Sequence, residues 1–123
     1  MKIIIWSCAL FLGVGAGAVE TTWKDGNGVK WTHLPIKSTF YRTYESCRRL
    51  RMRLPTANDL LDAIEYGLFD PEKNPAFAKE ISGFDWMWVR DPGILSAHWM
   101  VSKQGDTTAD QGNERHFGVC ASR

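Results

Sequence analysis

A proline set between two helical patterns is the feature that most constrains the fold of this chain. Residues 43–52 place apolar side chains at helical spacing, which predicts a first helix with Thr43 as its N-cap. Pro55 disfavours helical backbone at the residue before it, so the first helix ends by that point. Thr56, with Asp59 three residues later, has the pattern of a capping box and predicts the start of a second helix.

Short strands are predicted on both sides of these helices. Residues 29–32, 84–89, 96–102 and 114–121 are rich in aromatic and β-branched side chains or alternate in polarity. Residues 103–113 are polar and contain two glycines, which is typical of a hairpin connection. The order of strand, two helices and further strands predicts an α+β domain, in which two helices pack on a small, mostly antiparallel sheet.

Residues 1–18 have the pattern of a Sec-type signal peptide. Lys2 is basic, residues 3–14 form an apolar run, and small residues follow as far as Ala18. The apolar run is too short to cross a bilayer, so no stable membrane insertion is expected. We predict cleavage after Ala18 and a single mature domain, residues 19–123, that is periplasmic or secreted.

Cleavage of the signal would leave a pair of cysteines and a balanced charge. It removes Cys8, and in an exported protein the remaining Cys47 and Cys120 predict one disulfide, between the first helix and the last strand. It also removes Lys2 and no acidic residue, so 14 basic and 14 acidic side chains remain. A neutral chain has no global field that would steer it to nucleic acid, and nucleic-acid binding is not expected.

Four arginines form a local basic cluster near the end of the first predicted helix: Arg48, Arg49, Arg51 and Arg53. The favoured interpretation is a solvated helix face that forms salt bridges with the second helix. An anionic glycan or lipid headgroup as a ligand of this cluster is the alternative.

Taken in order, these motifs resemble the bacterial DUF1566 domain family, which also occurs at the end of Legionella collagen-like adhesins. The matching pieces are Gly28-Val29-Lys30-Trp31, Cys47, Arg53-Leu54-Pro55-Thr56, Asp59-Leu60-Leu61, Trp86 to Trp88, Ala97 to Val101, Gly105 and Val119-Cys120. The resemblance covers nearly all of the mature chain. It implies a C-type-lectin-like fold, with a ligand-binding surface in the loops between the later strands, about residues 84–114.

The resemblance does not extend to calcium-dependent sugar binding. Lectins that bind sugar through calcium carry Glu-Pro-Asn or Gln-Pro-Asp, followed by Trp-Asn-Asp, whereas the comparable triplet here is a predicted turn, Asp91-Pro92-Gly93, that lacks the second oxygen ligand. Asp106, Asp110 and Glu114 recur every four residues in a polar loop and are weak candidates for calcium ligands. A solvated hairpin is the favoured interpretation, and no cofactor is expected.

The sequence carries no recognisable catalytic pattern. His33, His98 and His116 are scattered without the spacing of metal ligands, and neither G-x-S-x-G nor H-E-x-x-H occurs. We therefore expect a protein that is not an enzyme.

Aromatic residues are the better functional signal. Tryptophan near charged side chains is typical of a surface that binds sugar or protein. The candidate ligand-binding residues are Trp88, Arg90, Asp91, His98, Trp99 and Arg115. The first hypothesis is therefore an exported bacterial binding module, active in adhesion or carbohydrate binding, that recognises a glycan or protein at the cell envelope. The alternative is a small structural or assembly subunit that docks on a larger envelope or fibre complex and binds no small ligand.

Overall fold

A computed structural model describes residues 21–123 of the chain. The predicted signal peptide and its cleavage site lie outside the described residues. Within residues 21–123, no helix combines the length and the apolar character that crossing a membrane requires.

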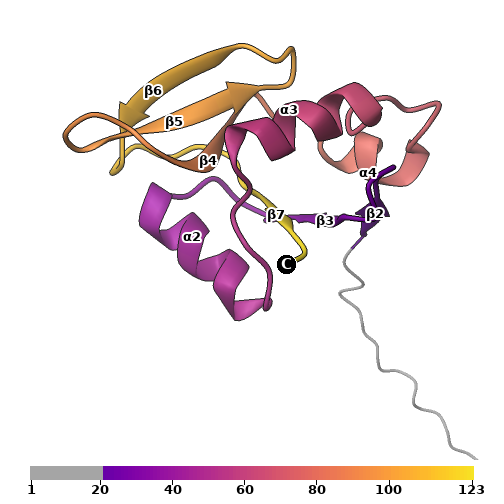
Figure 1. Cartoon of the computed structure of the whole chain (residues 1–123), viewed down its shortest axis with the longest axis horizontal. Coiled ribbons are helices and arrows are strands. Elements are labelled where there is room, and N and C mark those ends of the chain that lie inside the picture. Colours follow the sequence, from indigo (N-terminus) through magenta and orange to yellow (C-terminus); the bar gives the residue numbers. More distant parts are fainter. Residues whose placement is uncertain (1–20) are drawn as a thin grey trace, which may run out of the picture.

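The described chain is an α+β structure with three helices and two small antiparallel sheets. The elements are β2 (Trp23–Lys24), β3 (Lys30–His33), α2 (Phe40–Arg49), α3 (Ala57–Tyr66), α4 (Pro75–Glu80), β4 (Trp86–Pro92), β5 (Ala97–Ser102), β6 (Thr107–Gln111) and β7 (Val119–Ala121). Strand order is β2-β3-β7 in one sheet and β4-β5-β6 in the other. In Figure 1 the β4-β5-β6 sheet lies at the top, α2 lies below it, and β3 and β7 cross the middle.

The α+β class is confirmed, but the expectation of one sheet with two helices is corrected to two sheets with three helices. The extra strand β6 occupies the polar stretch predicted as a hairpin connection. Its side chains alternate between exposed and half-buried positions, because β6 pairs only with β5 at the edge of the sheet. An edge strand of this kind has no apolar face, so its sequence resembles a loop.

Strand β4 also extends further than predicted. Asp91 and Pro92 belong to the strand instead of forming a turn, and Pro92 pairs with His98 across a register shift. The connection to β5 follows at residues 93–96.

Helix α2 begins earlier than its sequence pattern predicts. Its N-cap is Thr39, whose hydroxyl accepts a hydrogen bond from the Arg42 backbone N–H. Thr43, the predicted cap, is instead a buried residue inside the helix, and its hydroxyl donates to the Thr39 carbonyl. Leu50, one of the apolar residues at helical spacing in the predicted helix, is the C-cap and is exposed.

Helix α3 agrees with its local signals. The Thr56 hydroxyl accepts from the Asp59 N–H, and the Asp59 carboxylate accepts from the Thr56 N–H, so the capping box is confirmed. Gly67 ends the helix with φ of 111°, a left-handed conformation that glycine adopts without a steric penalty. Leu60 and Ala63 on its inner face are fully buried.

Replacing Thr56 by alanine tests this cap. We expect Thr56→Ala to lower the free energy of unfolding by about 1 kcal/mol, because the Asp59 backbone N–H in the first turn loses the hydroxyl that accepts its hydrogen bond. Urea unfolding followed by circular dichroism measures the difference. Thr56→Ser, which keeps the hydroxyl, is the control, and equal stability of the alanine variant and wild type would contradict the role of the box.

The core consists of two adjoining clusters of buried side chains. The larger cluster lies under α3 and α4 and includes Trp31, Leu60 and Phe77. The smaller cluster lies against α2 and includes Trp88 and the two cysteines: Leu34, Phe40, Cys47, Leu54, Trp88, Met100 and Cys120.

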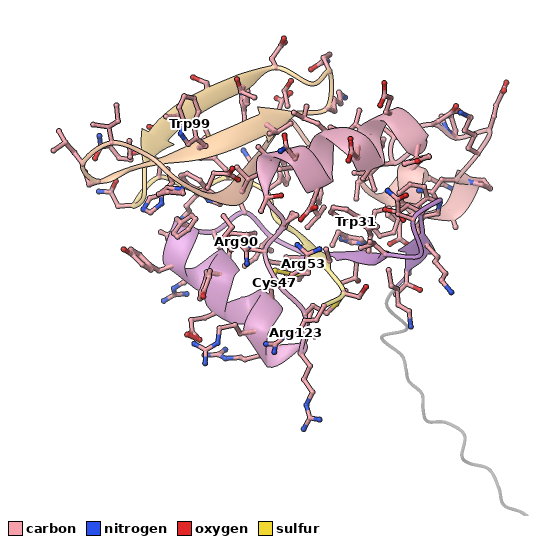
Figure 2. All side chains as sticks on the ribbon, in the orientation of Figure 1. Trp31, Cys47, Arg53, Arg90, Trp99 and Arg123 are labelled. Carbon is pink, nitrogen blue, oxygen red and sulfur yellow. A yellow bond between two sulfur atoms is a disulfide. The ribbon has the colours of Figure 1, made fainter. Side chains whose placement is uncertain are left out.

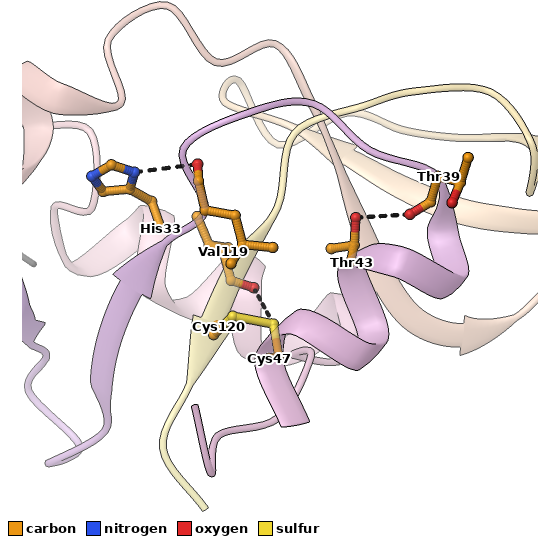
Figure 3. The surroundings of a disulfide bond; sticks show 7 residues. His33, Thr39, Thr43, Cys47, Val119 and Cys120 are labelled. Carbon is orange, nitrogen blue, oxygen red and sulfur yellow. Dashed lines mark hydrogen bonds between the residues drawn. A yellow bond between two sulfur atoms is a disulfide. The ribbon is translucent and has the colours of Figure 1, made fainter. Parts of the chain in front are cut away.

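The predicted disulfide is confirmed and lies inside the smaller cluster. Cys47 on α2 is bonded to Cys120 on β7, and both residues are fully buried. Figure 3 shows the bond bridging the helix and the strand. It joins residues separated by 73 positions, so it fixes the first long helix to the last strand.

Candidate functional site

The six residues proposed from the sequence do not form one site. The prediction that Trp88 contacts a ligand is corrected, because its side chain is 0% exposed and cannot reach a ligand at the surface. Its ring meets Phe40 edge-on, with centroids 5.7 Å apart, and its Nε1–H donates to the Ser38 carbonyl at 2.9 Å. Trp88 is therefore a core residue whose polar atom is already satisfied within the fold.

Asp91 and Trp99 line the same shallow hollow of about 380 Å³, beside Pro92. The Asp91 carboxylate accepts a hydrogen bond from the Ala57 backbone N–H at 2.6 Å, so it anchors the start of α3 to β4. Trp99 is 38% exposed and is labelled in Figure 2. Asp91 thus has a structural partner, and Trp99 is the exposed tryptophan of this hollow.

Arg90 and Arg115 lie elsewhere. Arg90 is exposed and lines a separate hollow beside α2, together with Arg53 and other arginines. Arg115 is exposed in the segment that leads to β7. Neither residue lines the hollow that contains Trp99 or the one that contains His98.

His98 lines the hollow that best combines the features of a binding site, which we call the loop hollow. It has a volume of about 440 Å³ and is formed by the start of α2, the β4–β5 connection and the end of β6. Its lining residues are Thr39, Tyr41, Leu95, Ser96, His98, Gln111, Gly112 and Asn113.

Backbone hydrogen bonds hold the three walls of the loop hollow together. The Phe40 N–H donates to the Gly112 carbonyl at 3.0 Å, and the Gly112 N–H donates to the Ser96 carbonyl at 3.2 Å. A Cβ on Gly112 would lie 3.0 Å from the His98 ring, so a side chain there would push on the ring. The Ser96 hydroxyl also donates to the Gln111 side-chain carbonyl, which orients that amide.

The His98 ring is packed as an aromatic group. It stacks on Phe40 with centroids 3.7 Å apart and 12° between the ring planes, and Tyr41 meets it edge-on. Burial lowers the pKa of His98 below its usual value, so the ring is neutral at pH 7. Its Nδ1 is buried and has no hydrogen-bond partner within residues 21–123. The hollow therefore has a neutral aromatic wall instead of a charged one.

The loop hollow can therefore bind a neutral polar ligand. Tyr41 and His98 offer aromatic surface, Thr39 and Ser96 offer hydroxyls, and the amides come from β6 and the residues after it. Hydroxyls and amides both donate and accept hydrogen bonds, as a polyhydroxylated ligand requires. A small number of converging polar groups beside an aromatic surface is typical of a site that binds a small ligand.

The weak calcium candidates are not brought together. Among the described residues, no group of three or more His, Cys, Asp or Glu side chains is placed to hold a metal ion. Asp110 instead bonds to His116 Nε2 at 2.8 Å. That hydrogen bond, together with one from the Gln111 N–H, lowers the pKa of the Asp110 carboxyl. Asp106 and Glu114 take no part in this pair.

Sequence reasoning missed most of the residues that line the loop hollow. Tyr41 has a usable signal only when α2 is known to begin at Phe40, because it is then 68% exposed on the outer side of the helix, whereas the sequence predicted a helix that begins at Thr43. A large aromatic residue outside the buried stripe of a helix indicates a surface role. Ser96 and Asn113 had no such signal, since their position depends on long-range pairing of the strands.

No family model matches the chain, and no curated protein matches it.

Proposed function

We propose that the chain is an exported bacterial binding module that recognises a cell-surface glycan or protein through the loop hollow, without catalysing a reaction. We further propose that its fold is C-type-lectin-like and of the DUF1566 kind. The fold proposal is supported by the α+β class, by the disulfide between α2 and β7, and by the aromatic strand β4 that follows the helices.

The observation that carries the functional proposal is the composition of the loop hollow. Tyr41 and His98 supply aromatic surface on which the apolar face of a sugar ring can stack, and Gln111 and Asn113 supply amides for its hydroxyls. Part of the hollow, from Leu95 to Asn113, also falls within the loops that the family resemblance indicates, whereas Thr39 and Tyr41 come from the start of α2. Because His98 is neutral, a neutral saccharide suits this wall better than an acidic one.

A second candidate is docking on a larger envelope protein, and the tip of the β4–β5 connection supports it. Ile94 and Leu95 are strongly exposed, Leu95 at 99%, and Leu95 borders the loop hollow beside Tyr41. Exposed apolar and aromatic residues that adjoin each other are typical of a protein contact. On this alternative the hollow receives a partner side chain instead of a sugar.

A glycan-array screen of the oxidised domain, residues 19–123, run with calcium and with EDTA, separates these candidates. Binding that is the same in both buffers supports a glycan module that uses aromatic and amide groups. Binding lost in EDTA contradicts the proposed mode of recognition. If no glycan binds in either buffer, and the domain instead captures an envelope protein in a way that requires Leu95, the result supports the docking subunit.

Substitution of Tyr41 tests the placement of the site. We expect Tyr41→Ala to weaken binding of the best array ligand at least about tenfold, because the exposed ring loses its stacking contact while the core is untouched. Isothermal titration calorimetry measures the change. Tyr66→Ala, which removes an exposed tyrosine from α3, is the matched control, and similar affinities for both variants would place the ligand elsewhere.

A further inference from the structure

We propose that a second hollow, formed where α2, β4 and the end of the chain meet, binds a tetrahedral oxyanion, as the phosphate or sulfate group of an ester. This arginine hollow has a volume of about 310 Å³. Its lining residues are Tyr44, Arg48, Met52, Arg53, Leu54, Arg90 and Arg123. Figure 2 labels three of the four arginines, Arg53, Arg90 and Arg123.

The arginines come from separate parts of the sequence, which distinguishes the hollow from a solvated helix face. Of the basic cluster noted in the sequence, Arg48 and Arg53 line the hollow, whereas Arg49 lines a different one. Arg90 comes from β4 and Arg123 follows β7. The fold thus collects four guanidinium groups around one space, and planar guanidinium groups match the oxygens of phosphate and sulfate.

Arg53 is held rigidly before any ligand arrives. Its backbone forms two hydrogen bonds with Ala121, each 2.8 Å long. Its side chain donates from Nε to the Ser122 carbonyl and from Nη1 to the Asp59 carboxylate. No hydrogen bond from Nη2 is found within residues 21–123, so this nitrogen of an ordered guanidinium group remains available as a donor. A donor that is already ordered loses little side-chain entropy when an anion binds.

The positive charge of the hollow exceeds the negative charge paired with it. Arg53 pairs with Asp59, and Arg48 pairs with Glu45 at 2.9 Å on the exposed surface of α2. No ion pair to Arg90 or Arg123 is found in the described part of the chain. Burial raises the pKa of Asp59, but hydrogen bonds from Arg53 and Thr56 outweigh it and keep the carboxyl ionised. Two carboxylates therefore offset four guanidinium groups.

The floor of the hollow indicates an ester in preference to a free ion. Leu54 is buried and Met52 is partly buried, so the arginines surround an apolar base, and Tyr44 adds an aromatic side chain. A free phosphate ion would leave these groups without a contact. The organic part of a phosphate or sulfate ester, from a modified sugar or a lipid headgroup, would cover them.

Calorimetric titration of the oxidised domain with glucose 6-phosphate, inorganic phosphate and glucose tests the proposal. We expect glucose 6-phosphate to bind more tightly than inorganic phosphate, glucose not to bind at this site, and affinity to fall as sodium chloride is raised. Equal affinity for the ester and the free ion would overturn the ester assignment, and binding of neither would overturn the site. Vesicles of phosphatidylglycerol, compared with phosphatidylcholine, separate a lipid source of the ester from a sugar source.

Substitution of Arg90 locates the anion. Arg90→Gln is expected to weaken glucose 6-phosphate binding at least about tenfold, with Arg90→Lys intermediate, because lysine keeps the charge but not the planar pair of donors. Arg49→Gln, which removes an equal charge from the neighbouring face of α2, should leave affinity unchanged. Equal losses in the Arg90 and Arg49 variants would indicate diffuse attraction and overturn the site. Tyr41→Ala distinguishes the two proposals, since it should affect the loop hollow alone.

Discussion

Removing the Cys47–Cys120 disulfide is expected to lower the free energy of unfolding by about 4 kcal/mol. The bond closes a loop of 73 residues, and the chain-entropy model assigns about that much stabilisation to a loop of this size. The total stability of a domain is roughly 5–15 kcal/mol, so the loss is a large part of it. The same bond also joins α2 to β7 within the smaller core cluster, where no other covalent link exists in the described chain.

The double variant Cys47→Ala/Cys120→Ala measures this effect without leaving buried thiols. Its thermal midpoint should fall by roughly 15–30 °C relative to the oxidised wild type. Adding a reductant should lower the midpoint of the wild type towards that of the variant and leave the variant unchanged. A fall of only a few degrees would mean that packing of α2 alone holds the smaller cluster together.

Trp88→Ala is expected to destabilise the domain by about 3–5 kcal/mol, because it opens a cavity in the smaller core cluster. The ring is fully buried against Phe40, and its loss also leaves the Ser38 carbonyl without its Nε1–H donor. Trp99→Ala, by contrast, removes a ring that is 38% exposed and should cost less than about 1.5 kcal/mol.

Chemical unfolding of both tryptophan variants checks this contrast, and near-ultraviolet circular dichroism shows whether the core stays ordered. The pair tests whether Trp88 acts in the core or at the surface. A stable, folded Trp88→Ala variant with lost ligand binding would contradict its assignment to the core. Since Trp88 and the disulfide share one cluster, the effects of removing both should be non-additive.

Local signals predicted those elements that depend on neighbouring residues in the sequence. The capping box at Thr56 and the left-handed Gly67 define both ends of α3 within a dozen residues, so its bounds were predictable. The start of helix α2 was not predictable, because Thr39 and Thr43 lie one turn apart and either can cap a helix. Long-range packing decides between them, since Phe40 stacks on His98 and must lie inside the helix that presents it.

The candidate site was less predictable than the fold, because it depends even more on packing between residues far apart in the sequence. Trp31 is buried in the core, but Trp86 is only partly buried and Trp88 takes the central position of the smaller cluster. Spacing alone cannot tell which of two tryptophans, two positions apart on one strand, reaches Phe40. The arginine hollow likewise requires Arg53 and Arg90 to meet across the fold, which no pattern in either segment indicates.

The measurement that tests the proposed binding function most directly is a map of amide chemical shifts in the ¹⁵N-labelled, oxidised domain as the best array ligand is added. The account predicts that the largest changes occur around the loop hollow, at residues 39–41, 94–98 and 111–113. Absence of any array ligand, or changes centred on Trp99 or on the arginine hollow, would contradict the assignment of function to this surface.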